Sequence, residues 1–135
     1  MSIFIDTNIF VALRNENDIN HEKSKEIMKK ALLGEYGTIY TSDYVFDEAV
    51  TVALARTKNV DFAKDIGDYI LSAKRIKMIF VDDTIFNDAW RLFKKLSRKK
   101  LSFTDCTNIA IIRNYNIEYI ASFDSHFDGL VNRIF

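Results

Sequence analysis

Short runs of apolar residues alternate along this chain with longer amphipathic segments. The runs Ile3–Ile5, Met78–Val81 and Tyr119–Ser122 predict strands that are buried on both faces. Thr38–Thr41 predicts another strand, and Ile134–Phe135 predicts a last short one. Helical spacing occupies the segments between them, over residues 9–14, 21–33, 43–57, 61–73, 82–98 and 104–115.

Strands that alternate with helices indicate crossover connections, so the pattern predicts an α/β fold with a mainly parallel sheet. A length of 135 residues fits a single domain over residues 1–135. In open parallel sheets, ligands bind beyond the carboxyl ends of the strands. Residues directly after the strands are therefore the first candidates for a functional site.

Composition narrows the class of protein. A hydrophobic content of 48% excludes a disordered chain, and the absence of Pro with only four Gly argues against an all-β sandwich. A single Cys excludes a disulfide framework and cysteine-based zinc sites. With 19 basic and 19 acidic residues, any nucleic-acid contact needs a local basic patch. No apolar run has membrane-spanning length and no signal peptide is evident, so we expect a cytoplasmic protein that makes no membrane contact.

Acidic residues occur where the predicted sheet would hold a site. Asp6 directly follows the first strand, and Asp124 comes two residues after the last main strand. Asp105 opens a helix, and at 100° per residue Ile109 and Ile112 lie within about 40° of it on the helical wheel. A carboxylate on such a buried stripe requires a partner or a metal ion.

Glu48 lies at the flank of the apolar face of its helix, whereas Asp47 points further outward. Taken singly, these acids also fit structural roles, as helix caps, turn residues or exposed helix positions. Together, four carboxylates without an adjacent basic residue would repel one another and raise one another's pKa. Mg²⁺ or Mn²⁺, which prefer oxygen ligands, would relieve that repulsion.

In order along the chain, these residues resemble the motifs of the PIN-domain family, and within it the VapC-like toxins of toxin–antitoxin pairs. No single motif is specific, but four of them in this order and spacing are. The matching segments are Phe4–Asn8, Ser42–Ala49 with Glu48, Ser102–Asp105 and Ile120–Phe127.

The resemblance implies a three-layer α/β/α sandwich and a metal-dependent endoribonuclease. It implies that metal-activated water hydrolyses RNA phosphodiesters at an acidic site, and that this site holds Mg²⁺ or Mn²⁺. Cys106 departs from the small Ala or Ser of relatives, but it is nearly as small. The residues that carry over are the catalytic and metal-binding quartet Asp6, Glu48, Asp105 and Asp124, the polar Thr7, Asn8 and Ser122 beside it, and Asp128 in the following turn.

The resemblance also implies a small antitoxin that covers the cleft and a toxin homodimer. Phe10, Val11 and Ile27 on the early helices are candidate interface positions, although core packing explains them equally well. A basic cluster before Asp105 is a candidate contact for RNA phosphates, or else the solvated end of a helix. The cluster residues singled out for RNA are Lys95, Arg98, Lys99 and Lys100.

Three alternatives stay open at this level. The first is a PIN-type nuclease of RNA processing or decay, and the second is a binding protein without catalysis. The third is a phospho-acceptor receiver module, because Asp82-Asp83 after a strand resembles the acidic pair of that class. That pair should follow the first strand, however, and here it comes late.

Overall fold

The computed structural model describes residues 1–135 and is built on one sheet of five strands. The strands lie in the order β3-β2-β1-β4-β5, and every neighbouring pair is parallel. Receiver-like doubly wound folds have the strand order 2-1-3-4-5, which differs from the order seen here, so the receiver alternative is wrong. The strand bounds are β1 Ser2–Ile5, β2 Thr38–Ser42, β3 Ile76–Ile79, β4 Tyr119–Ala121 and β5 Asn132–Ile134.

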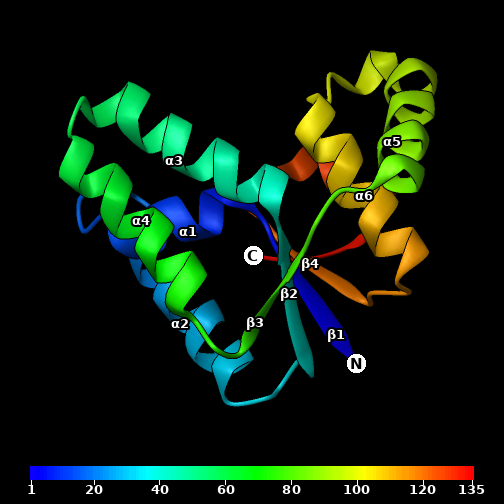
Figure 1. Ribbon diagram of the computed structural model, residues 1–135. Coiled ribbons are helices and arrows are strands. Elements are labelled where there is room, and N and C mark those ends of the chain that lie inside the picture. The colour runs from blue at the N-terminus through cyan, green and yellow to red at the C-terminus, as the bar shows by residue number, and fades with distance from the viewer.

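Helices cover both faces of this sheet, which confirms the predicted three-layer α/β/α sandwich (Figure 1). In Figure 1, α1, α2 and α4 lie on one side of the strands and α5 and α6 on the other, while α3 lies beyond the end of β2. No helix is both long and apolar enough to cross a bilayer. The helices are α1 Thr7–Arg14, α2 His21–Leu32, α3 Asp43–Thr57, α4 Val60–Ser72, α5 Asp83–Lys95 and α6 Phe103–Asn114, with 3₁₀ turns η1 Ser97–Lys99 and η2 Ser125–Phe127.

Short polar side chains set where five of the helices begin. Each accepts a hydrogen bond from a backbone N–H of the first turn, which would otherwise have no partner. Asp82 is one of them, so the pair Asp82-Asp83, which resembled the acidic pair of a receiver module, marks the start of α5. The capping residues are Asp6, Ser42, Asn59, Asp82 and Ser102.

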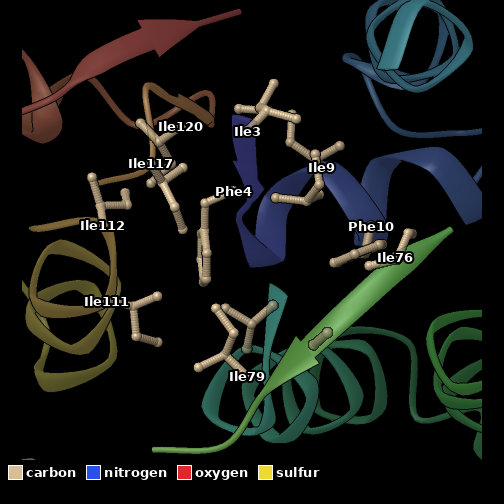
Figure 2. Packing of buried hydrophobic residues seen from close by; sticks show 14 of the residues in the cluster. Ile3, Phe4, Ile9, Phe10, Ile76, Ile79, Ile111, Ile112, Ile117 and Ile120 are labelled. Carbon is tan, nitrogen blue, oxygen red and sulfur yellow. The ribbon is translucent and has the colours of Figure 1, made fainter. Parts of the chain in front are cut away.

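The central strand lies in the middle of the apolar core. Phe4 of β1 is fully buried, and Figure 2 shows it between Ile111 of α6 and Ile9 of α1. Strands covered on both faces read as continuous apolar runs, which explains the sequence signal of β1. The same core buries Phe10, Val11 and Ile27 of the early helices. Core packing is therefore the correct explanation of these residues, and their assignment to an interface is wrong.

β3 lies two residues earlier than the apolar run Met78–Val81 predicts. It is an edge strand in which only Ile76 and Ile79 are buried, and Phe80 beyond it is 70% exposed. Val81 has left the sheet, because its N–H donates to Asp43 Oδ1 at 2.9 Å. An apolar run is thus a poor guide at a sheet edge, where one side of the strand lacks a neighbour.

Three other bounds differ by more than one residue. α5 ends at Lys95 rather than Arg98, because η1 follows and Lys100 adopts a left-handed conformation with φ 57°. α1 begins at Thr7 rather than residue 9, since Asp6 caps it. The last strand is Asn132–Ile134 and pairs with β4, so it begins before the predicted Ile134–Phe135.

Candidate active site

The topology opens a crevice beyond the carboxyl ends of β1 and β4. The chain moves from β1 to β2 and β3 in one direction, then returns through α5 and α6 to pair β4 with the other side of β1. Ligand sites of doubly wound sheets occupy this point, where the direction of strand order reverses. Asp6 directly follows β1 and Ser122 directly follows β4, so both lie at the crevice.

Asp6 is held by hydrogen bonds to both of its carboxylate oxygens. Oδ1 accepts from the Thr7 N–H at 2.8 Å and from Asn108 Nδ2 at 3.1 Å, and Oδ2 accepts from Ser122 Oγ at 2.7 Å. The side chain is almost fully buried, at 3% exposure. These bonds fix its orientation toward the crevice.

Ser122 connects the two strand ends. Its hydroxyl donates to Asp6 and accepts from Asn8 Nδ2 at 3.2 Å and from the Asp124 N–H at 3.1 Å. Asn8 Oδ1 in turn accepts from the Phe123 N–H at 3.1 Å. The polar residues singled out beside the predicted quartet therefore join α1 to the loop that carries Asp124.

Asp105 lies in the first turn of α6, where it forms a capping box with Ser102. Its Oδ2 accepts from the Ser102 N–H at 3.0 Å, and its own N–H donates to Ser102 Oγ at 3.0 Å. Glu48 lies on α3 and is half-buried, whereas its neighbour Asp47 is exposed, as the helical wheel predicts. Asp124 caps η2 and accepts from the His126 N–H at 2.9 Å.

These four carboxylates line one cleft of about 410 Å³. They reach it from four separate segments: the end of β1, the middle of α3, the start of α6 and the loop after β4. The convergence predicted from the sequence is therefore what the fold produces. The other lining residues are Thr7, Asn8, Val11, Asp18, Ile19, Asn20, Val52, Arg56, Ser102 and Phe123.

Burial and mutual repulsion perturb two of the acids. Burial raises the pKa of Asp6 from its ordinary 3.8 to about 7, the Ser122 hydrogen bond opposes the rise, and the charges of Asp105 and Glu48 add to it. Burial also raises the pKa of Asp105, against its hydrogen bonds to Ser102 and with further repulsion from Glu48 and Asp124. None of the four carboxylates forms an ion pair with Lys or Arg. A carboxylate cleft without such partners stabilises bound cations.

The donor set fits a hydrated divalent cation better than a closed protein cage. No three Asp, Glu, His or Cys side chains are close enough to ligate one ion together. Mg²⁺ typically retains several waters and uses one or two carboxylates, so the wider spacing suits ligation partly through water. Thr7 Oγ1 is buried at this cleft without a hydrogen-bond partner, which leaves a further oxygen available.

Three residues at the site were missed by the sequence analysis. Asn108 is fully buried on α6 and donates to Asp6, and its position one turn after Asp105 is the signal that could have found it. Asp18 and Arg56 line the cleft. Arg56 lies eight residues after Glu48 on α3, about two turns further along the helix.

Asp128 does not line the cleft, contrary to the expectation that it approaches the site. It is exposed and forms a two-bond ion pair with Arg133, at 2.7 Å and 3.1 Å. The basic cluster divides into two parts. Arg98, Lys99 and Lys100 line a pocket beside His126, whereas Lys95 lies in a separate groove between α5 and α6.

A doubly wound α/β protein with an acidic site at its strand ends is the class that fold and cleft define. The PIN domain model matches residues 3–131, so the chain belongs to the PIN domain family. A VapC ribonuclease of Archaeoglobus fulgidus is 27% identical over 128 residues, which cover 94% of this chain and 80% of that protein. The 23S rRNA-specific endonuclease VapC20 of Mycobacterium tuberculosis is 24% identical over 127 residues, 94% of this chain and 92% of the relative.

Solved structures agree with this assignment. One is the crystal structure of Mycobacterium tuberculosis VapC20, which is described as a Sarcin-Ricin loop cleaving toxin. It matches this chain with a TM-score of 0.81 at 25% identity, and the match covers 93% of this chain and 92% of that chain. VapBC2 from Rickettsia felis has the same fold, with a TM-score of 0.69 at 17% identity over 99% of this chain and 98% of that chain. The chain is therefore a PIN-domain protein that is similar in sequence and fold to proteins named VapC.

Proposed function

We propose that this protein is a metal-dependent endoribonuclease that hydrolyses phosphodiester bonds of RNA. The observation that carries the proposal is the cleft in which Asp6, Glu48, Asp105 and Asp124 converge without an ion-pair partner from Lys or Arg. Two relatives that span most of the chain are named as RNA-cleaving enzymes, which supports the same chemistry.

In this proposal the four carboxylates hold one or more Mg²⁺ or Mn²⁺ ions, directly or through water. A divalent cation in such a site activates water and stabilises charge on a phosphate oxygen. Ser122 and Asn108 fix the orientation of Asp6 through their hydrogen bonds. Asp105 is fixed by its capping box, so the two acids are positioned before any ligand binds.

The first experiment is a cleavage assay on a panel of RNAs that includes tRNA and single-stranded oligomers. Each RNA is incubated with Mg²⁺ or Mn²⁺, with chelator, and with an Asp105→Asn variant purified in parallel. We expect cleavage that is lost both with chelator and in the variant. Cleavage that persists in the variant would refute the assignment of Asp105, and failure to bind Mn²⁺ would refute the metal-dependent mechanism.

We further propose that the protein is the toxin of a cytoplasmic type II toxin–antitoxin pair. Two of the similar solved structures are VapBC2 from Rickettsia felis and FitAcB from Neisseria gonorrhoeae. An apolar groove of about 820 Å³ between α1, α2 and α4 offers a surface for such a partner. This groove, like the carboxylate cleft, is lined in part by residues of α1. Its apolar lining is Leu13, Met28, Leu32, Leu33 and Tyr69.

The proposed homodimer requires a surface other than the buried residues of the early helices. Phe86 and Trp90 of α5 are 46% and 48% exposed, and both rings pack against Phe103. Exposed aromatic clusters are typical of protein interfaces. We expect Trp90→Glu to shift the protein from dimer to monomer in analytical ultracentrifugation, and a monomeric wild type would refute the homodimer.

A further inference from the structure

A cleft lined by carboxylates repels RNA, so basic residues at or beside the cleft are needed to attract the strand. Arg56 is the basic residue that lines the cleft itself. Eight residues at 1.5 Å and 100° each place it about 12 Å along α3 from Glu48 and about 80° around the helix axis. It is exposed and forms no ion pair, so its charge is available to a ligand.

A second group of cations lies in a pocket of about 280 Å³ without any apolar side chain. Arg98, Lys99 and Lys100 contribute its positive charge, and none of them forms an ion pair within the chain. The acid in its lining, Asp128, is already paired through two hydrogen bonds with Arg133. The Arg133 pair lowers the pKa of Asp128, and the nearby charge of Lys99 adds to the effect. One carboxylate that is already paired thus faces three further cations in this pocket.

This basic pocket adjoins one end of the carboxylate cleft. Lys100 lies two residues before Ser102, and His126 lies two residues after Asp124, while both Ser102 and Asp124 line the cleft. Arg56 stands near the C-terminal end of α3. In Figure 1 that end of α3 and the turn between α5 and α6 lie on opposite sides of the molecule, with the carboxyl ends of the strands between them.

We propose that a single RNA strand crosses the cleft with its phosphates bound at two cationic sites that flank the carboxylates. One site is Arg56, and the other is the basic pocket of Arg98, Lys99 and Lys100. This inference rests on the proposed function, and it adds the path of the substrate. Cations on both sides hold the flanking phosphates and so deliver the intervening one to the acidic residues, which by themselves repel it.

Salt dependence measures these contacts directly. Each phosphate contact on a single strand contributes about −0.7 to the slope of log affinity against log salt concentration. A fourfold rise in salt, from 50 to 200 mM, therefore weakens binding about 2.6-fold per contact. Without Arg56, the weakening between these two salt concentrations should be about 2.6-fold smaller than in wild type. Without two cations of the basic pocket, it should be about sevenfold smaller.

The variants are Arg56→Gln and the double variant Arg98→Gln with Lys99→Gln. Lys100 is left in place because its left-handed backbone conformation makes a substitution harder to interpret. The matched control is Lys74→Gln with Lys77→Gln, which removes two exposed charges just before and at the start of β3, away from the carboxyl ends of the strands. Binding of a fluorescent single-stranded RNA is titrated in chelator at several salt concentrations, and melting curves confirm that each variant is folded.

We expect a shallower salt slope for both test variants and an unchanged slope for the control. With Mn²⁺ present, the test variants should raise KM at constant kcat. A slope in the test variants equal to that of wild type, or an equal change in the control, would overturn the two-site path. If wild type binds RNA with these slopes but cleaves none with any metal, the proposed function fails while the path stands.

A length series separates the two sites. Two oligomers are compared, each extended from the cleaved phosphate in one direction only. The oligomer that extends toward Arg56 should bind Arg56→Gln more weakly but bind the basic-pocket variant normally. The oligomer that extends the other way should show the reverse. Equal sensitivity of both oligomers to both variants would contradict the placement of the sites on opposite sides of the cleft.

Discussion

Ionisation of Asp6 is expected to destabilise the metal-free protein as the pH rises from 5 to 8. Burial and the neighbouring carboxylates raise the pKa of this acid to about 7 in the folded chain, against 3.8 ordinarily. The folded state therefore binds the proton more tightly than the unfolded state. The stabilising contribution of the protonated form is full below the unfolded pKa and is lost as the pH rises through the folded pKa.

The size of this effect follows from the two pKa values. Each unit of difference corresponds to about 1.4 kcal/mol, so the whole shift amounts to about 4 kcal/mol, of which about 3 kcal/mol falls between pH 5 and pH 8. For a domain of this size, that change lowers Tm by about 10 °C. The raised pKa of Asp105 acts in the same direction, so it strengthens the fall rather than cancelling it.

The assay is urea unfolding in chelator at pH 5 and pH 8, for wild type and for Asp6→Asn. We expect the free energy of unfolding of wild type to fall with pH and the fall to be much smaller in the variant. Asn keeps an acceptor oxygen for the Thr7 N–H and cannot ionise. A wild-type stability that is flat or rises over this range, or an equal fall in the variant, would refute the reasoning.

The remaining predictions concern single residues. Asp105→Asn should raise the Tm of the metal-free protein by relieving repulsion and should shrink the rise in Tm that Mn²⁺ produces; an equal Mn²⁺ shift in both proteins would count against Asp105 as a ligand. Ser122→Ala should cost about 1–3 kcal/mol in urea unfolding, because the partner atoms of its hydroxyl stay buried without it. Cys106 is fully buried, and burial raises the pKa of its thiol to about 11, so iodoacetamide should label it only in denaturant; labelling of the native protein would contradict this burial. Asp128→Asn should leave kcat for RNA unchanged, since that carboxylate pairs with Arg133 outside the cleft, and a large loss would return it to the site.

Local signals predicted most elements well, because they depend on neighbouring residues. The apolar run Ile3–Ile5 marks a strand that is covered on both faces, and the Ser102 cap lies next to the helix it begins. The edge strand β3 was misplaced because the apolar run continues past its end, through the exposed Phe80 to Val81, which bonds to Asp43 instead of a strand. The end of α5 was misplaced because basic residues suit both a helix and a turn.

The carboxylates were found from the sequence because Asp6 and Asp124 follow strands, Asp105 begins a helix, and Glu48 lies at the flank of the apolar face of its helix. Their convergence was inferred from parallel topology, in which the carboxyl ends of strands share one edge. Asn108 was missed because a buried amide on an apolar helix face has no pattern that marks its partner across the sheet. Its hydrogen bond to Asp6 joins residues 102 positions apart.

The sequence by itself determined the fold class, most of the helix starts and the set of candidate acids, since periodicity and capping act over a few residues. Only the tertiary structure decided which polar groups meet. It paired Asp128 with Arg133, separated Lys95 from the rest of its cluster, and placed Arg56 in the lining of the acidic cleft. These contacts depend on how helices from distant parts of the chain pack over one sheet. A local sequence pattern carries no information about which distant segments become neighbours.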